Sequence, residues 1–345
     1  MPGLASELDA IAAAESFSGV VRVERPERPL VERAYGLADK QHAIPNRIET
    51  QFGIASGTKS LTALTVVSLI EEGRFELATT ARSLLGDDLP LIAGDVTIEH
   101  LLSHRSGIGD YLDEEVELDY DAYLMPVPVQ ELATTEQYLA VLGGHPTKFP
   151  AGERFAYCNS GFVVLALIAE RVSGVPFAEL VRQRVCEPAG MTDTAFLRSD
   201  ELPGSAALGY LRVDGVWRTN VFHLPVRGTG DGGIYTTAAD ISALWSASFA
   251  GRIVAPHWVA EIVRPRSDVP SESGAEMRKY GLGFWLQATT ATVMGGGDTG
   301  VSFRSVHDPR SGITHTVVSN TGDGATSLMR YLDERLETGT ASGPA

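Results

Sequence analysis

Residues 52–73 read FGIASGTKSLTALTVVSLIEEG, and in this stretch a short apolar segment turns into a long helix. Apolar side chains recur from Thr58 to Glu72 at the spacing of a wide buried helix face, and Gly73 can end the helix as its C-cap. Ser56 stands just before the helix and Lys59 lies inside its first turn. Because residues three apart share a helix face, the Lys59 ammonium can approach the Ser56 hydroxyl.

A serine and a lysine in this arrangement are the residue types of an activated nucleophile and its base. A serine hydroxyl reacts poorly until a base takes its proton, and a lysine whose pKa is lowered by burial can be that base. The helix amino terminus adds unpaired N–H groups that suit a developing oxyanion. The alternative is a serine that caps the helix beside a solvated lysine, since Ser-x-x-Lys is a common string. Further elements must therefore decide between the two interpretations.

A second polar element precedes another strong helix, expected at residues 162–173. Tyr157 and Asn159 flank a cysteine there, so that both polar tips can point into a cleft. The tyrosine could move a proton between nucleophile and leaving group, and the asparagine could donate to a substrate carbonyl. The alternative is a tyrosine packed on the core and an asparagine that only caps the helix.

A glycine-rich stretch, GGGDTGV at residues 295–301, is the third element. Glycines between two expected strands allow close approach of the backbone to a ligand. The N–H of Val301 could complete an oxyanion hole with the N–H of Ser56. The alternative is an ordinary glycine-rich hairpin.

In this order the three elements resemble those of serine β-lactamases and penicillin-binding proteins, whose motifs include Ser-x-x-Lys and a late Lys-Thr-Gly. The Tyr-x-Asn element is similar to that of the branch containing class C β-lactamases, D-Ala-D-Ala carboxypeptidases and family VIII-type esterases. Four other stretches resemble this branch: AYGLAD at 34–39, LLSHRSGI at 101–108, FPAGERFAY at 149–157 and GGIYTTAAD at 232–240. The resemblance covers roughly residues 20–319.

The resemblance implies an acyl-enzyme mechanism without a cofactor or a metal. Ser56 would attack a carbonyl, Lys59 and Tyr157 would move protons, and water would resolve the ester. The residues implied in substrate binding are Asn159, Asp298, Thr299 and Gly300, and the implied oxyanion donors are the backbone N–H groups of Ser56 and Val301.

One position departs from the family pattern. The late motif normally begins with lysine or histidine, which meets a substrate carboxylate, and the matching residue here is Asp298. Two carboxylates 4 Å apart repel by about 4 kcal/mol at an effective dielectric constant of ~20. We therefore expect little or no β-lactamase activity and a preference for neutral esters or cationic amines, unless a nearby Arg304 compensates. The alternative role for Asp298 is a turn residue that bonds its own loop.

The expected fold is of the mixed α/β (α+β), β-lactamase-like class. Residues 19–24 and 30–35 at one end, and 301–307 and 313–319 at the other, alternate as half-buried antiparallel strands do. An antiparallel sheet built from both termini and flanked by helices, with a mostly helical insertion, fits this order. We predict a sheet domain from 1–60 and 215–338, a helical domain at 61–214 and a disordered tail at 339–345.

Composition limits the partners. The chain has 28 Lys plus Arg against 44 Asp plus Glu, a net charge of -16, so nucleic acid is a poor partner. No run of ~20 apolar residues predicts a membrane span, and the amino terminus lacks the pattern of a signal peptide. The chain therefore reads as cytoplasmic, although a secreted protein whose signal peptide had been removed would read the same. His100 and His104 could pair as metal ligands, but no His-Glu-x-x-His accompanies them.

The predicted function is a serine hydrolase acting on a small ester, amide or short peptide: an esterase, amidase or D-aminopeptidase-like enzyme. The alternatives are a β-lactamase or DD-carboxypeptidase, an acyltransferase, and a slowly acylated penicillin-binding or peptidoglycan-sensing protein. An α/β-hydrolase is disfavoured because no Gly-x-Ser-x-Gly elbow occurs. The sequence leaves the natural substrate and the oligomeric state open.

Overall fold

An eight-stranded antiparallel sheet forms the centre of the molecule, with strand order β2-β1-β14-β13-β12-β11-β10-β9. The computed structural model describes residues 3–26, 28–116, 119, 121–270, 278–287 and 291–340, the last four by their backbone only. The strands of this sheet are β1 Gly19–Arg25, β2 Arg28–Tyr35, β9 Ser267–Val269, β10 Arg278–Tyr280, β11 Trp285–Leu286, β12 Thr292–Asp298, β13 Val301–Asp308 and β14 Ile313–Ser319. Because β1 pairs with β14 along six residues, the two ends of the chain meet in one sheet. The predicted fold class is confirmed.

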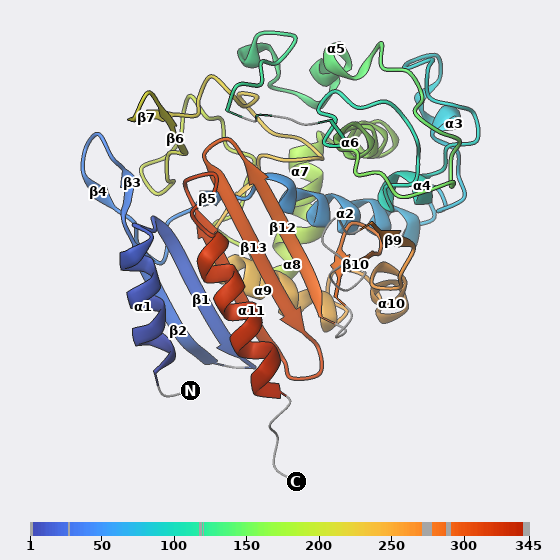
Figure 1. The fold of residues 1–345 in the computed structure, drawn as a ribbon. Helices are drawn as coiled ribbons and strands as arrows, with labels where there is room; N and C mark the ends of the chain where they lie inside the picture. Colours follow the sequence, from blue (N-terminus) through green and yellow to red (C-terminus); the bar gives the residue numbers. More distant parts are fainter. Residues whose placement is uncertain are drawn as a thin grey trace.

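Helices cover both faces of this sheet (Figure 1). The terminal helices α1 Leu4–Ala14 and α11 Thr326–Thr340 lie side by side on one face, where Leu8 and Leu332 are buried in a core of their own. Helix α9 Ala238–Phe249 covers β1 and β14 from the other face. A fully buried Trp245 of α9 donates its Nε1–H to Ser305 of β13 at 2.8 Å, which satisfies its polar atom.

The middle of the chain is mostly helical, as expected. Its elements are the 3₁₀ turn η1 Ala55–Gly57, then α2 Thr58–Glu71, α3 Ala81–Leu85, α4 Ile98–Leu102, η2 Val129–Glu131, η3 Thr135–Tyr138, α5 Leu139–Leu142, α6 Asn159–Ser173, α7 Phe177–Val181, η4 Arg182–Cys186 and α8 Glu187–Ala189. Helix α10 Pro256–Ile262 follows α9. One apolar cluster joins α2 and α6 to β14 and α9, so the core is continuous across the predicted boundary. The division into two domains stays a prediction.

Three small two-stranded sheets lie outside the main sheet. They are β3 Leu37–Asp39 with β4 Ile44–Pro45, β5 Phe52–Gly53 with β8 Tyr235–Thr236, and β6 Tyr210–Val213 with β7 Val216–Thr219. The β6–β7 hairpin turns through Asp214-Gly215, both at positive φ (50° and 77°), as a tight two-residue turn requires. The predicted boundary at 214/215 therefore falls inside a hairpin.

Two details of the C-terminal region differ from the sequence prediction. Strand β12 runs through the glycines to Asp298, where a loop was expected, because glycines let this strand pass against the nucleophile turn described below. Helix α11 extends to Thr340, so that it includes the first two residues of the predicted tail. Residues 341–345 of that tail lie outside the described residues.

Within the described ranges, no single helix is long and apolar enough to cross a membrane. One pair, Asn159–Ser173 with Phe177–Ala189, passes that test by length and composition only if taken together, and it is bent by 85°.

Candidate active site

Ser56 lies in the 3₁₀ turn that opens helix α2. The residue before it, Ala55, has a φ of 43°, a left-handed conformation that is uncommon for a residue with a Cβ. Thr58 stabilises this turn, because its Oγ1 donates to the Ala55 carbonyl at 2.8 Å and accepts from the Ile234 N–H at 3.2 Å. The N–H groups at this helix start point where no intrahelical acceptor exists. Local strain therefore presents the serine at the helix amino terminus.

The Lys59 amine meets three oxygens. Its Nζ lies 2.9 Å from Ser56 Oγ, 2.8 Å from Asn159 Oδ1 and 2.7 Å from the backbone carbonyl oxygen of Asp231. The side chain is almost fully buried, at 2% exposure. Three partners fit an ammonium that donates three times, and equally a neutral amine that donates to Asn159 and Asp231 and turns its lone pair to Ser56. The structure thus brings the predicted pair into direct contact.

Burial lowers the pKa of Lys59, and this effect outweighs the opposing attraction of nearby carboxylates, of which Asp231 and Glu114 act most strongly. The same burial raises the pKa of the Asp231 carboxyl, although Lys59 and the hydroxyl of Tyr111 oppose that rise. The segment that carries Asp231 packs tightly, since a Cβ on neighbouring Gly230 would come within 2.1 Å of the Phe162 carbonyl oxygen. The third partner of Lys59 is therefore held by backbone packing.

Tyr157 lies beside Ser56 and keeps its proton. Burial raises the pKa of its phenol well above 10, while a hydrogen bond with Ser56 acts in the opposite direction. The Lys59 Nζ lies 4.9 Å from the ring centroid, within cation–π range. Trp285 stacks on the ring at 5.8 Å with an interplanar angle of 13°. The phenol can donate a proton here, and a standing phenolate is disfavoured.

His104 packs against the ring of Tyr157. The two rings are 4.4 Å apart, and His104 Nδ1 accepts the Cys158 N–H at 3.1 Å. Burial lowers the pKa of His104 well below 6.5, so this imidazole is neutral. His100, in contrast, caps the start of its own helix by accepting the Thr97 N–H. In the described part of the chain, no group of three or more His, Cys, Asp or Glu side chains could hold a metal ion.

Asn159 is buried and its amide is already engaged. Its Oδ1 accepts from Lys59, while its Nδ2 donates to the Leu112 carbonyl at 3.0 Å and to Glu114 at 3.1 Å. The structure therefore places Asn159 behind the lysine. Donation to a substrate, as the sequence predicts, requires that a substrate oxygen replace Glu114 or Leu112.

The end of helix α6 that carries Asn159 is capped from a distant part of the chain. Both oxygens of Asp110 accept backbone N–H groups there, from Asn159 at 2.6 Å and from Ser160 at 2.8 Å. Burial raises the pKa of Asp110, and these two N–H groups oppose the rise. The cap thus comes from Asp110, where the sequence suggested self-capping by Asn159.

The glycines of β12 pack directly against η1, the 3₁₀ turn that carries Ser56. A Cβ on Gly296 would come within 2.2 Å of the Ile54 carbonyl oxygen and 2.8 Å of the Ser56 nitrogen. The neighbouring Gly297 has open space at the same position. Only a glycine fits at 296, because backbone meets backbone there.

The hairpin register shows which amides of this strand face the nucleophile. Asp298 and Val301 close a two-residue turn, so they form a hydrogen-bonded pair of the β12–β13 ladder. Hydrogen-bonded and non-hydrogen-bonded pairs alternate along the ladder, so the next pair, Gly297 with Ser302, is not hydrogen-bonded. The N–H of Gly297 therefore points away from β13, toward the edge beside Ser56. The N–H of Val301 is used inside the hairpin, and the register does not support the predicted role of Val301 as an oxyanion donor.

Of the remaining predicted residues, Asp298 alone turns a side chain to the cleft. Burial raises its pKa to about 7, and the charges of Asp231 and Glu114 add to the rise. Its Oδ1 accepts the Thr299 N–H at 2.8 Å, as the turn interpretation predicted. Thr299 is buried, at 2% exposure, and a Cβ on Gly300 would meet the Tyr210 nitrogen, away from Ser56.

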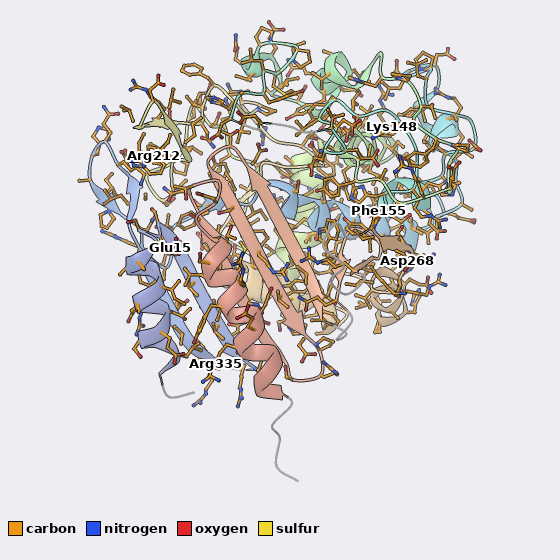
Figure 2. All side chains as sticks on the ribbon, viewed as in Figure 1. Glu15, Lys148, Phe155, Arg212, Asp268 and Arg335 are labelled. Carbon is orange, nitrogen blue, oxygen red and sulfur yellow. The ribbon has the colours of Figure 1, made fainter. Side chains whose placement is uncertain are left out.

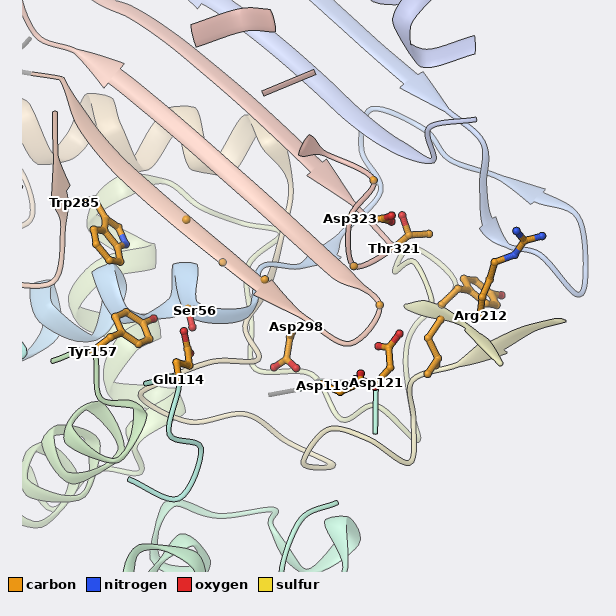
Figure 3. Close-up of a pocket in the computed structure, with 18 of the residues that line it drawn as sticks. Ser56, Glu114, Asp119, Asp121, Tyr157, Arg212, Trp285, Asp298, Thr321 and Asp323 are labelled. Carbon is orange, nitrogen blue, oxygen red and sulfur yellow. The ribbon is translucent and has the colours of Figure 1, made fainter. Parts of the chain in front are cut away.

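Of these groups, Ser56, Tyr157 and Asp298 line a cavity of about 1320 Å³. Its lining comes from opposite sides of the β12–β13 hairpin, with Glu15 and Arg212 on one side and Phe155 on the other (Figure 2). Figure 3 shows Ser56, Tyr157 and Trp285 at one end, Asp298 near the middle and Arg212 at the other end. A smaller cavity of about 70 Å³ shares Asp298 and also contacts Asp231. Ser56 thus lies at one end of a long groove.

Sequence reasoning missed Asp110, Glu114 and Asp231. Each is one acid among 44, and none belongs to a motif that the sequence analysis used. A signal existed for Asp231, which directly precedes the family-like stretch at 232–240, and for Asp110, which follows the stretch at 101–108. No pattern in the sequence indicates that Glu114 reaches the Asn159 amide.

Comparison with known proteins gives one consistent result. The model of the family described as Beta-lactamase matches residues 5–339. The putative penicillin-binding protein PbpX of Bacillus subtilis (strain 168) is 26% identical over 274 residues, 78% of this chain and 62% of that protein, so the chain spans less than two thirds of its length. Esterase EstB of Burkholderia gladioli is 30% identical over 314 residues, 81% of this chain and 78% of that protein. A solved penicillin-binding protein from Bacillus halodurans superimposes with a TM-score of 0.88 at 34% identity, covering 95% of this chain and 99% of that one.

Proposed function

Because the chain belongs to the Beta-lactamase family, we propose that it is a serine hydrolase that cleaves esters or amides through an acyl-enzyme on Ser56. The observation that carries this proposal is the contact of 2.9 Å between Lys59 Nζ and Ser56 Oγ, with the lysine buried and its pKa lowered. A desolvated amine that already touches the hydroxyl has the geometry of a general base.

Acylation begins when the Lys59 lone pair takes the Ser56 proton while Oγ attacks the substrate carbonyl carbon. Asn159 and the Asp231 carbonyl accept the remaining N–H groups and keep the lone pair aimed at Oγ. The carbonyl oxygen becomes an oxyanion, for which we propose the N–H groups of Ser56 and Gly297 as donors. The register of β12 supports Gly297 in this role.

Tyr157 completes the proton transfers. Its high pKa keeps the phenol protonated at neutral pH, so it can protonate the leaving alcohol or amine as the C–O or C–N bond breaks. The proton held by Lys59 then restores the phenol. In deacylation a water molecule takes the place of the leaving group, loses a proton to the same relay and attacks the acyl carbon. The bond between the acyl carbon and Oγ then breaks, the acid departs, and the relay returns the proton to Ser56 Oγ.

The substrate class follows from the charge around the nucleophile. Asp298 lies in the groove, and Glu114 and Asp231 add to its negative field. When Asp298 is ionised, a carboxylate close to the scissile bond, as in a β-lactam, is repelled, whereas a neutral ester or a cationic amine is tolerated or attracted. We therefore propose an esterase, amidase or D-aminopeptidase-like activity on small esters, amides or short peptides, with weak or no β-lactamase activity.

Labelling with a fluorophosphonate probe, together with turnover of p-nitrophenyl acetate and nitrocefin, tests this function. We expect labelling of the wild type and not of Ser56→Ala, and faster turnover of the ester than of nitrocefin. Lys59→Met should lower kcat by about 10²–10⁴, the usual contribution of a general base. Labelling without turnover would instead support a penicillin-binding or sensing protein, and faster nitrocefin hydrolysis would contradict the proposed substrate class.

A further inference from the structure

The end of the groove remote from the catalytic residues carries two cations on an aromatic ring. Lys40 Nζ lies 4.5 Å from the Trp217 ring centroid, and the guanidinium carbon of Arg212 lies 5.2 Å from the same centroid. Lys40, Arg212 and Trp217 all line the cavity that contains Ser56. Figure 3 shows Arg212 at the opposite end of this cavity from Tyr157. We call Lys40 and Arg212 the distal cation pair.

The chain is rich in acidic residues, yet among the described residues no carboxylate forms an ion pair with either of these two cations. Acidic residues outnumber basic ones 44 to 28, and Arg154, which lines the same cavity, is paired with Glu115. In the ranges that the structure describes, neither the Lys40 ammonium nor the Arg212 guanidinium makes an ion pair. Asp39, next to Lys40, is held by His42 at 2.7 Å. Burial lowers the pKa of Lys40, and no carboxylate counters that change.

The site is built on the β6–β7 hairpin. Arg212 and Trp217 face each other across the β6–β7 hairpin, whose turn at Asp214-Gly215 fixes the register. The Tyr210 hydroxyl of the same hairpin accepts a hydrogen bond from the backbone N–H of Lys40 at 2.8 Å, which connects the end of β3 to β6. Stacking on Trp217 orients both charged groups before any ligand arrives.

We propose that the distal cation pair is a second binding subsite, which takes a carboxylate carried by the substrate far from the bond that Ser56 attacks. This inference rests on the proposed function and narrows its substrate class. Arginine pairs with a carboxylate through two parallel hydrogen bonds, and lysine adds a point charge. Asp298 lies near Ser56, the carboxylates of Asp119, Asp121 and Asp323 line the stretch toward the far end, and Lys40 and Arg212 lie at that end. The complementary ligand is therefore a short peptide whose free amino end lies among the carboxylates and whose free carboxyl end reaches the distal cation pair.

Peptides of the form D-Ala-(Gly)n, with n from 1 to 4, test the subsite as competitive inhibitors of p-nitrophenyl acetate hydrolysis. Each peptide is used with a free C-terminal carboxylate and as the C-terminal amide. We expect that at one or more lengths the acid binds about tenfold more tightly than the amide. The double variant Lys40→Ala/Arg212→Ala should abolish this ratio. Arg218→Ala, on the opposite face of the same hairpin, removes one charge outside the groove and should preserve it.

Equal binding of acid and amide at every length would overturn the subsite, as would a ratio that survives in the double variant. The same peptides are also titrated by calorimetry into Ser56→Ala, which reports binding without turnover. If the wild type neither reacts with fluorophosphonate nor hydrolyses the ester, the proposed function fails, while the calorimetric ratio still tests the subsite. The acid-to-amide ratio should shrink as salt is raised, because the contact is between charges.

Discussion

At the scale of single residues, the site depends on the competition between burial and charge at Lys59. Burial penalises the ammonium, and four carboxylates, those of Asp231, Glu114, Asp110 and Asp298, favour it. Burial dominates, so the amine has a lowered pKa although acids surround it. A lysine with this balance gives up its proton more readily than a solvated lysine does, as the proposed role of general base requires.

Asp298 gives the groove a pH dependence near neutrality. Its pKa of about 7 means that the carboxyl is neutral in acid and becomes anionic as the pH rises through that value. A cation in the groove is therefore bound better above pH 7 than below. We expect the ratio of kcat/KM for butyrylthiocholine, a permanent cation, to that for neutral S-butyl thiobutyrate to rise about tenfold between pH 6 and 8.

The matched variant for this experiment is Asp298→Asn, which keeps the shape and loses the titration. Its ratio of the two substrates should stay flat over the same range. Because Lys59 titrates equally for both substrates, it cancels in the ratio. A rise that persists in Asp298→Asn would assign the effect to another carboxyl group, and Asp231, whose pKa burial also raises, is the candidate.

At the scale of elements, the close packing of β12 against the turn that carries Ser56 decides which substitutions in β12 the site can accommodate. Gly296→Ala places a methyl group 2.2 Å from the Ile54 carbonyl oxygen and 2.8 Å from the Ser56 nitrogen, so strand and turn must separate. We expect fluorophosphonate labelling and ester turnover to fall by at least 100-fold. Gly297→Ala adds the same methyl group in open space and should stay within about threefold of the wild type.

A thermal melt by circular dichroism distinguishes loss of geometry from loss of fold in this pair. If Gly296→Ala were fully active, the close packing of β12 on Ser56 would be disproved. If Gly297→Ala were inactive while folded, the Cβ itself would block the groove.

Helix α6 depends on a cap that another segment supplies. Asp110→Ala leaves the N–H groups of Asn159 and Ser160 without their acceptor, and we expect a loss of about 2–4 kcal/mol in the free energy of unfolding. Asp110→Asn keeps one acceptor oxygen and should lose less. Urea denaturation measures both, and equal losses would indicate that the negative charge, and not the hydrogen bonds, stabilises the helix.

Loss of this cap should also affect activity, because Tyr157 and Asn159 lie at this end of the helix. In the folded fraction of Asp110→Ala we expect a lower kcat with a smaller change in KM. Unchanged kcat would show that His104 and the Lys59 contact suffice to position these residues.

At the scale of the whole molecule, the apolar core beneath the terminal helices is separate from the large core that contains helix α2. Leu8 is fully buried between the terminal helices and the sheet, in a cluster that excludes the residues around Ser56. Leu8→Ala should cost about 2–5 kcal/mol in urea unfolding, while kcat per labelled active site stays the same. Ala13→Ser, on the exposed side of α1, is the control and should change stability by less than about 0.5 kcal/mol. A fall in kcat with Leu8→Ala would contradict the separation of the two cores.

Local patterns predicted much of this arrangement. Alternation at both ends of the chain predicted the sheet, and the spacing in residues 58–72 predicted helix α2 with Ser56 and Lys59 on one face. What the glycine-rich segment does was harder to predict. The motif placed the oxyanion donor at Val301, whereas the ladder points the Gly297 amide at the nucleophile, because hydrogen bonding in a hairpin alternates from its turn.

The sequence alone determined the elements and the order of the reactive residues, because periodicity and motifs act between neighbours along the chain. Only the tertiary structure decided that Asp110 caps α6, that Glu114 and Asp231 surround Lys59, and that Lys40 and Arg212 share the groove of Ser56. These contacts join segments far apart in the chain. Burial and hydrogen bonding depend on distance in space, which the sequence does not display, and it is burial that sets the pKa values of Lys59 and Asp298.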